Sequence, residues 1–362
     1  MDVSSRKSSI ERHRSAGRRI AAVFPGRYPA EVLHAAGFLP VEVWDPPGPT
    51  ARASGHLQPF VCGVGLASLE LLLSDKAPAL DCLLFPHLCD TLQNLFTIVR
   101  DCIHHPTPAF LFYPPRNTGH SGAEAFVVTQ ARRLAGQVAG LAGRTFSDSD
   151  LADAGAAVDR AHAALSRLYA ARRNSAGRWS NTEFYRTVRL RELVLPDELV
   201  KAAEHLLADA ERGAAGPADV KLVLSGVLPD RSLLALLDQR NVHVVEDDLI
   251  STGRRLLRKP IEPAPDPWTA AARRLLSLPP CTSIASPIEH RIAWLTELVR
   301  SSGAAGVLLH TVKFCELELF DHPFVVQGLR KAGIPVLVLE SELHQPQVGQ
   351  LATRLDAFLE VL

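Results

Sequence analysis

The sequence has 362 residues, 47% of them hydrophobic and 22% charged, so it can bury substantial cores and its length favours two or three domains over one. Lys plus Arg and Asp plus Glu both number 39, and the resulting net charge of zero excludes the broad basic field that nucleic-acid binding usually requires. No apolar run approaches the roughly 20 residues of a membrane span, and the N-terminus lacks the apolar core of a secretory signal. These features predict a cytoplasmic protein that binds neither nucleic acid nor membranes.

The chain begins with a polar lead-in, residues 1–19, that is rich in Ser and Arg. From 20 to 117, short apolar runs alternate with helical patterns, which is typical of β-α units around a parallel sheet. The runs are LPVEVW, CLLFP and AFLFY, and the helical patterns are YPAEVLHAAG, LASLELLLSD and TLQNLFTIVRD. This region is the predicted first α/β lobe.

Strand signals are absent from 118 to 215, where Ala, Arg and Leu dominate. Apolar residues from Leu151 to Leu168 step by three and four, which predicts one apolar face on a long helix. Ser147 followed three residues later by Asp150 indicates a capping box at the start of that helix. The stretch ERGAAGPADV then indicates a linker.

From 216 to 362 the β-α rhythm resumes, with VKLVLSG, VHVVE, GVLLH and IPVLVLE as strands and a last helix around GQLATRLDAFLEVL. The predicted fold class is therefore α/β, with two Rossmann-like (flavodoxin-like) parallel-sheet lobes and a helical insert between them.

Six cysteines in a chain without a secretion signal are expected to be reduced, as core residues, metal ligands or a nucleophile. In parallel sheets, functional groups collect where strands end at their carboxyl edge. Cys82 opens its predicted strand and Cys89 lies just past its end, so the two are on the order of 15 to 20 Å apart. Cys102 lies at the far end of the following helix and therefore at the opposite pole. The pattern does not fix the position of Cys281, and its role stays open.

Three cysteines remain, Cys62, Cys89 and Cys315. Each follows a predicted strand and opens a helix, where the positive end of the helix dipole favours a thiolate. The three converge if the two lobes face one another across a cleft. Their spacing is far from a C-x-x-C signature, so three interpretations stay open: a shared metal site, a lone reactive cysteine, or three ordinary partly buried thiols.

Four segments, YPAEVLHAAGFLPVEVW, FPHLCDTLQNL, KFCELELFDHPFVVQGLRKAGIPVLVLESE and GQLATRLDAFLE, resemble the 2-hydroxyacyl-CoA dehydratase family in order and spacing. That family also contains ATP-dependent benzoyl-CoA reductase subunits, and the resemblance runs from about residue 20 to the C-terminus. It implies a 4Fe-4S cluster held by three cysteines in the inter-lobe cleft, and the matching positions are Cys62, Cys89 and Cys315. Three thiolates on four irons would leave one iron free for water, sulfide or a substrate oxygen, and Gly63 and Gly65 would let backbone amides approach the cluster sulfurs.

The resemblance also implies an acyl-CoA substrate, a related family subunit or a second copy as partner, and an ATP-dependent iron–sulfur activator protein that supplies single electrons. In the dehydratases the electron enters the thioester carbonyl, and the resulting radical expels the 2-hydroxyl, which is a hydro-lyase reaction. In the reductases it enters an aromatic ring. A radical must be kept from water and oxygen, so an enclosed cleft and anaerobic metabolism are expected.

One stretch departs from the family pattern. The family commonly has Ser or Pro directly after the first cluster cysteine and a nearby Arg, whereas this chain has CGVGLAS. Three functions therefore stay open: a radical 2-hydroxyacyl-CoA dehydratase subunit, a benzoyl-CoA reductase-type subunit, and a non-catalytic electron-relay partner.

Several charged side chains are weaker candidates. Glu31, His87 and Glu340 lie at predicted strand ends or helix starts where a proton carrier could work, although Glu31 is also explained by the helix dipole and His87 by capping its loop. Lys313 and Arg116 are candidate contacts for a CoA phosphate, with a solvated loop lysine as the alternative for Lys313.

Acidic residues near the second-lobe strand ends complete the set. Glu342, like Glu340, follows IPVLVL at the edge where it could line the cleft. Glu316, Glu318 and Asp321 are expected to cap and solvate the helix after Cys315.

Overall fold

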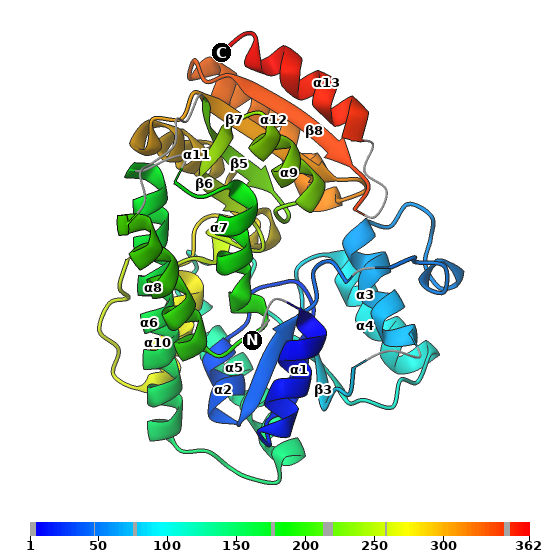
Figure 1. The fold of residues 1–362 in the computed structure, drawn as a ribbon. Coiled ribbons are helices and arrows are strands. Elements are labelled where there is room, and N and C mark those ends of the chain that lie inside the picture. The colour runs from blue at the N-terminus through cyan, green and yellow to red at the C-terminus, as the bar shows by residue number, and fades with distance from the viewer. Residues whose placement is uncertain are drawn as a thin grey trace.

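The computed structural model describes residues 5–46, 48–74, 78–174, 178–212, 220–257, 259–343 and 348–362. In this part of the chain two four-stranded sheets, both entirely parallel, are surrounded by helices (Figure 1). The first sheet has the order β2-β1-β3-β4 and the second the order β6-β5-β7-β8. Each sheet therefore places its own first and third strands at the centre. The α/β class is confirmed.

The strands of the first sheet are β1 Arg19–Val23, β2 Phe38–Glu42, β3 Cys82–Pro86 and β4 Ala109–Phe112; those of the second are β5 Val220–Gly226, β6 Val242–Leu249, β7 Gly306–Val312 and β8 Val336–Ser341. All seven predicted apolar runs overlap a strand. The eighth, β1, was not predicted, because RIAAV begins with an arginine and two of its four apolar residues are alanines.

The helices are α1 Arg6–Ser15, α2 Ala30–Ala35, α3 Gly63–Leu73, α4 Asp90–Thr97, α5 Ala123–Ala142, α6 Asp148–Asn174, α7 Asn181–Val188, α8 Pro196–Arg212, α9 Arg231–Gln239, α10 Pro267–Leu276, α11 Ile288–Ser302, α12 Glu316–Lys331 and α13 Val348–Leu359. Short 3-10 turns are η1 Ala53–Gly55, η3 Arg189–Glu192, η4 Gly253–Arg255 and η5 Thr282–Ile284, and α4 continues into a π-helical turn, η2 Ile98–Cys102. No helix among the described residues is long and apolar enough to cross a bilayer.

Helices α5 to α8 follow one another between β4 and β5, where the sequence lacks strand signals (Figure 1). The predicted capping box is present, because Ser147 Oγ accepts from the Asp150 amide at 3.2 Å and the Asp150 carboxylate accepts from the Ser147 amide at 2.7 Å. The predicted linker and the boundary near residue 215 fall largely outside the described residues. Helix α10, from the predicted second lobe, packs on α5 and α6.

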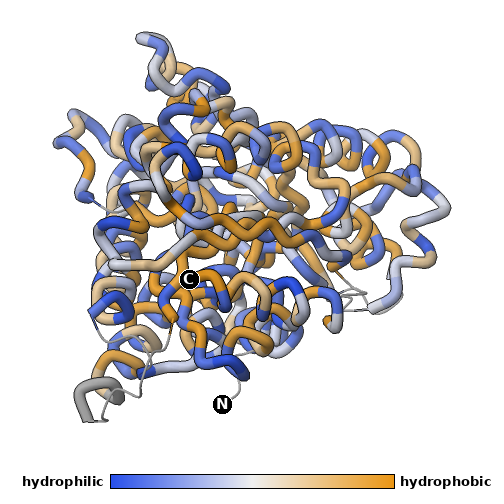
Figure 2. Tube along the Cα trace, turned by 90° about the horizontal axis from the view of Figure 1, so that it is seen from above, coloured by the Kyte–Doolittle hydropathy of each residue, from blue (hydrophilic) through white to orange (hydrophobic). Residues whose placement is uncertain are grey.

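A shared hydrophobic core joins the two sheets. One cluster of buried side chains includes Ile20 and Leu39 near the first sheet, Leu168 of α6, and Leu222 and Leu308 of the second sheet. Burial of each such side chain contributes about 1.5 to 3 kcal/mol. Figure 2 shows the hydrophobic segments concentrated along central strands, with hydrophilic segments mainly in outer helices and loops. Because this core is continuous, the carboxyl edges of the two sheets hold fixed positions relative to one another.

Candidate functional site

A cavity lies where the strands of both sheets end. Residues at the ends of six strands line it: Pro25, Trp44 and Leu88 beyond β1, β2 and β3, Val227 and Ile250 beyond β5 and β6, and Val312 at the end of β7. The space between its lining atoms, including its opening, is about 400 Å³. Cys62, Cys89 and Cys315 all line this one cavity, so residues far apart in the chain meet at the carboxyl edge of parallel strands.

Each of these three cysteines is the N-cap residue of a helix: Cys62 of α3, Cys89 of α4 and Cys315 of α12. In each case the backbone amide three residues further on favours the thiolate, from Gly65, Leu92 and Glu318 respectively. The first amides of a helix have no partner within it, and they carry the positive end of its dipole. Three helix N-termini therefore converge on a cavity that carries three sulfur ligands, which suits a negatively charged inorganic group.

Burial nevertheless raises the pKa of all three thiols. The pKa of Cys89 rises to about 12, through burial and then through the neighbouring Cys62. The pKa of Cys315 lies well above its usual value, again through burial first and then through Cys62. A nucleophilic cysteine has a lowered pKa, and burial shifts the pKa of these three thiols in the opposite direction. Iron would displace these protons, as metals do at thiol sites.

Two glycines allow the close approach of the helix N-termini. A Cβ on Gly65 would lie 2.8 Å from Cγ2 of Thr91 in α4, and one on Gly63 would lie 2.9 Å from Cβ of Leu343, just beyond β8. The Gly65 amide favours the thiolate of Cys62, and the approach of backbone amides to the sulfurs of a cluster stays a prediction. The absence of side chains also lets α3 pack against α4 and against the edge of the second sheet.

Three thiols at one cavity are of the donor type that an iron–sulfur cluster takes. Among the described residues, no group of three or more His, Cys, Asp or Glu side chains is arranged to hold one metal ion. In a cluster each thiolate binds a different iron, so the sulfurs need only surround a common core. Besides the cysteines, the lining of the cavity is apolar, which limits the access of water.

The fold and this site define an α/β protein with three thiols at a cavity shared by two parallel sheets. Residues 26–362 match the family described as 2-hydroxyglutaryl-CoA dehydratase, D-component, and the chain belongs to that family. This confirms the family suggested by the sequence segments.

Similar proteins include the lactoyl-CoA dehydratase subunit beta of Anaerotignum propionicum, 24% identical over 349 residues that cover 96% of this chain and 92% of the relative. The (R)-2-hydroxyglutaryl-CoA dehydratase subunit beta of Acidaminococcus fermentans is 24% identical over 365 residues, covering 99% and 96%. A benzoyl-CoA reductase subunit of Thauera aromatica is 22% identical over 353 residues, covering 95% and 90%. The family thus includes both dehydratase and reductase subunits.

None of the weaker candidates in the first half of the chain lines the cysteine cavity. Glu31 is buried on α2 and contacts Arg274 at 3.3 Å, at a second cavity described below. His87 packs its ring on Tyr113 at 5.3 Å, and burial lowers its pKa. Arg116 is exposed.

The candidates in the second half also lie outside the cavity lining. Lys313 forms an exposed ion pair with Glu342, with 2.7 Å between Nζ and Oε1, which raises the pKa of the lysine. Such an exposed pair contributes little to stability. Glu340 is exposed on β8. The arrangement therefore favours the solvated-lysine interpretation of Lys313.

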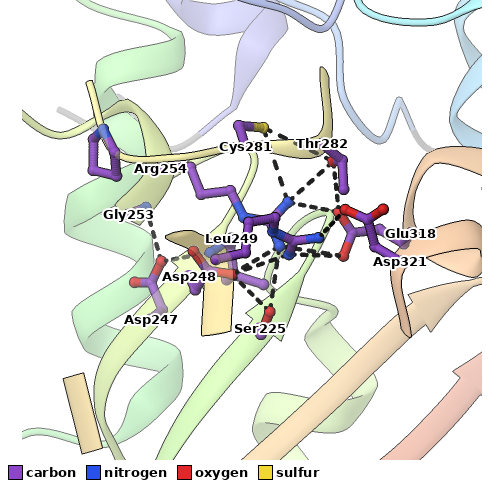
Figure 3. Close-up of polar contacts among 12 residues, drawn as sticks. Ser225, Asp247, Asp248, Leu249, Gly253, Arg254, Cys281, Thr282, Glu318 and Asp321 are labelled. Carbon is purple, nitrogen blue, oxygen red and sulfur yellow. Dashed lines mark hydrogen bonds and ion pairs between the residues drawn. The ribbon is translucent and has the colours of Figure 1, made fainter. Parts of the chain in front are cut away.

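The expectation that Glu318 is a solvated capping residue is wrong. Its side chain is fully buried in the first turn of α12, where Arg254 Nη1 donates to its Oε1 at 2.6 Å and Arg291 Nη2 lies 3.7 Å from its Oε2 (Figure 3). These arginines hold the pKa of Glu318 well below its usual value despite burial. Asp248 of β6 adds a second carboxylate, 2.8 Å from Arg254 Nη2. This buried network anchors the helix that Cys315 caps.

Cys281 belongs to the same network and not to the cavity. Its sulfur lies 3.9 Å from Arg254 Nη1 (Figure 3). It is buried, caps η5, and its sulfur also lies 3.0 Å from Ser283 Oγ. Burial opposes ionisation, but Arg254 and then Arg27 lower the pKa of this thiol. The remaining two cysteines also lie elsewhere, since Cys82 is buried within β3 and Cys102 is exposed at the end of η2.

Proposed function

We propose that this chain is a 4Fe-4S subunit of a radical 2-hydroxyacyl-CoA dehydratase, with Cys62, Cys89 and Cys315 as the ligands of the cluster between two Rossmann-like lobes. The convergence of these three helix-capping thiols on one apolar cavity carries the proposal. The dehydratase beta subunits among the similar proteins support the reaction class.

The cluster would supply one-electron transfer, by which the thioester of an acyl-CoA is reduced and water is eliminated. The residues of this chain would tune that transfer. The amides of Gly65, Leu92 and Glu318 stabilise negative charge on the sulfurs, and the apolar wall around Trp44 lowers the local dielectric.

The proposed partners are an acyl-CoA, an ATP-dependent iron–sulfur activator protein and a related family subunit. Two of the similar proteins are beta subunits, which supports pairing with a second, related chain. We place the assembly in the cytoplasm of cells with anaerobic metabolism.

One observation favours a second candidate, an electron-relay subunit without its own substrate. The lining of the cysteine cavity includes no charged side chain and no histidine among the described residues, so it offers neither a proton carrier nor a cation for a CoA phosphate. This agrees with the stretch CGVGLAS after the first cysteine.

Anaerobic purification followed by iron and sulfide analysis tests the cluster. We expect about four irons and four sulfides per chain, and loss of the cluster absorbance and of the electron paramagnetic resonance signal of the reduced protein in each of C62S, C89S and C315S. Variants C82A and C102S are the matched controls and should keep the cluster. A protein that cannot be reconstituted, or a C102S variant that loses iron as fully as C89S, would contradict the assignment.

Activity assays then separate the functions. Reconstituted protein with activator, ATP and a strong reductant is tested against 2-hydroxyacyl-CoA and aryl-CoA panels. Turnover of a 2-hydroxyacyl-CoA by this chain alone supports the dehydratase, and turnover of an aryl-CoA points to the reductase-type alternative. Where turnover needs a paralogous subunit, binding of the acyl-CoA to this chain supports the dehydratase, and binding of the acyl-CoA to the paralogue alone supports the relay.

A further inference from the structure

A second cavity lies on the other side of the β1 and β2 strand ends. It is bounded by α2, α6, η3, α8 and α10, and the space between its lining atoms, including its opening, is about 790 Å³. Arg27 and Glu42 line this cavity, whereas their neighbours in the chain Pro25 and Trp44 line the cysteine cavity. The two cavities are therefore distinct, and residues at the ends of β1 and β2 line both of them.

The carboxylate of Glu42 is fully used by neighbouring side chains. Its Oε1 accepts from Tyr28 Oη at 3.0 Å and from Arg255 Nη2 at 2.8 Å, and its Oε2 accepts from Trp44 Nε1 at 2.8 Å and from Arg255 Nη1. Arg255 thus forms a two-pronged pair with Glu42, and both carboxylate oxygens are saturated.

Arg191 is left without a carboxylate of its own. Within the described residues, its Nη1 donates to the carbonyl of Arg255 at 3.2 Å, and the nearest carboxylate oxygen to its Nη2 is the occupied Oε1 of Glu42, at 4.0 Å. Burial, and then the neighbouring Arg255, lower the pKa of Arg191 to about 10. An arginine lining a cavity with unused donors and too little negative charge is suited to bind an anion.

His162 supplies a second donor to the same cavity. Its Nδ1 accepts from the Leu257 amide at 3.0 Å, which leaves the ring proton on Nε2. Burial and the arginines Arg191, Arg255 and Arg274 lower the pKa of His162 to about 3, so the ring is neutral at ordinary pH. The imidazole therefore donates one hydrogen bond and adds no charge.

The lining also includes a group with the reverse excess of charge. Arg274 pairs with Asp159 through Nε at 2.7 Å and Nη2 at 2.6 Å, and with Glu31 through Nη1 at 3.3 Å. Two carboxylates face one arginine there, which repels a second negative charge on a ligand. Aliphatic side chains also line the cavity: Ala161, Leu165, Val194, Leu199, Leu275 and Leu278.

We propose that this cavity binds a small organic monocarboxylate with an aliphatic or aromatic body, its carboxylate placed between Arg191 and His162. The aliphatic walls match an apolar body. The proposal does not depend on the cluster or on the reaction at the cysteine cavity.

Calorimetry on the intact, anaerobically purified protein tests this site. Hexanoate and phenylacetate are compared with hexanamide and phenylacetamide, which keep the apolar body without the charge, and with adipate, which adds a second carboxylate. We expect saturable binding of both monocarboxylates. The amides should bind at least about tenfold more weakly, because hydrogen bonds to charged groups exceed neutral ones by about that factor. Adipate should also bind at least about tenfold more weakly, because its second carboxylate is repelled by the two carboxylates around Arg274.

The variant R191Q should weaken hexanoate binding about tenfold or more, while its urea midpoint without ligand stays at or above that of the wild type, because the arginine has no carboxylate of its own. The control R167Q removes an exposed arginine of α6, 3.2 Å from Glu204, and should bind as the wild type does. Absence of binding at millimolar hexanoate and phenylacetate, equal binding of the amides, or a folded R191Q variant with unchanged affinity would each overturn the proposal.

Discussion

The two sheets have the same connectivity but contribute differently to the cysteine cavity. Cys89 follows β3 and Cys315 follows β7, which are the third strands of their sheets, and each caps the next helix. Between the second and third strands the sheets diverge. In the first sheet that segment brings Cys62 to the cavity, whereas in the second it carries α10 away to pack on α5 and α6 and holds Cys281 among arginines.

This difference shows that the strand order alone does not determine whether a cysteine reaches the cavity. The packing of the segment between the second and third strands also decides it. Both sheets require a glycine just at or beyond the end of their first strand, since a Cβ on Gly26 would lie 2.5 Å from Pro86 Cβ and one on Gly226 would lie 2.0 Å from the His310 carbonyl. Both glycines have positive φ, 156° and 147°. The glycines at equivalent places are required by the fold of both sheets. Cys62 and Cys281, which the two sheets place differently, distinguish the cavity from the buried network.

The largest expected effect comes from making the second sheet resemble the first. Three residues after Cys89 the first sheet has Leu92, and at the same place after Cys315 the second has buried Glu318. The variant E318L leaves Arg254 and Arg291 short of a partner and should lower the free energy of unfolding by about 3 to 5 kcal/mol. Urea denaturation measures this, with E316Q at an exposed position as the control. A loss below about 1 kcal/mol would show that the network is not needed to anchor α12.

As the pH falls, the stabilisation from buried His34 and His162 should be lost before that of the Glu318 network. Burial lowers the pKa of His34 to about 4 and of His162 to about 3, from an ordinary value of 6.5. Their stabilisation is fully present above pH 6.5 and is lost as the pH falls toward the folded-state values, by about 1.4 kcal/mol per pH unit for each histidine. The Glu318 network, whose pKa lies well below 4.5, should persist in this range.

Urea midpoints at about pH 7, 6 and 5 check this slope, and H34Q, which cannot take up a proton, should have a shallower one. Equal slopes for the wild type and H34Q would show that His34 is not buried in its neutral form.

A moderate effect is expected where the first sheet's helices meet. The variant G65A places a Cβ against Thr91 Cγ2 and should cost about 1 to 3 kcal/mol of stability. The double variant G65A/T91S removes the clashing methyl and should recover much of that loss in a double-mutant cycle. Purely additive effects would mean that this contact does not limit the approach of α3 to α4.

The smallest effect is a gain in stability away from both cavities. Gly136 lies in α5, and a Cβ added there would meet no atom within 4 Å, so G136A should raise the free energy of unfolding by about 0.5 to 1 kcal/mol. Thermal unfolding measures this gain. The variant G136A is the reference for G65A, because Gly136 has room for a side chain and Gly65 does not.

The strand ends were predictable from sequence, and the charged clusters were not. Position relative to apolar runs was enough to separate Cys89 and Cys315 from Cys82 and Cys102, because the carboxyl edge of a parallel sheet follows from chain direction alone. Cys62 lies far beyond the end of β2 and reaches the cavity at the start of α3. Glu42 and Arg255, by contrast, are 213 residues apart, and neither belongs to a local pattern.

The same reason explains the error at Glu318, whose arginine partners come from distant elements. Long-range partners of this kind are set by how η4 and α11 fold back, and no period in the sequence encodes that path. The missed strand β1 has a different cause, since its small apolar side chains are weak evidence for a strand by themselves.

The wide separation of the helix-capping cysteines along the chain has a consequence for biosynthesis. Cys315 leaves the ribosome roughly 220 residues after Cys89, on the order of tens of seconds later at about 5 to 20 residues per second. Until Cys315 is synthesised, Cys62 and Cys89 are the only two of the three cavity thiols that are present. Under the proposed function, an iron carrier would therefore have to act after Cys315 has been synthesised.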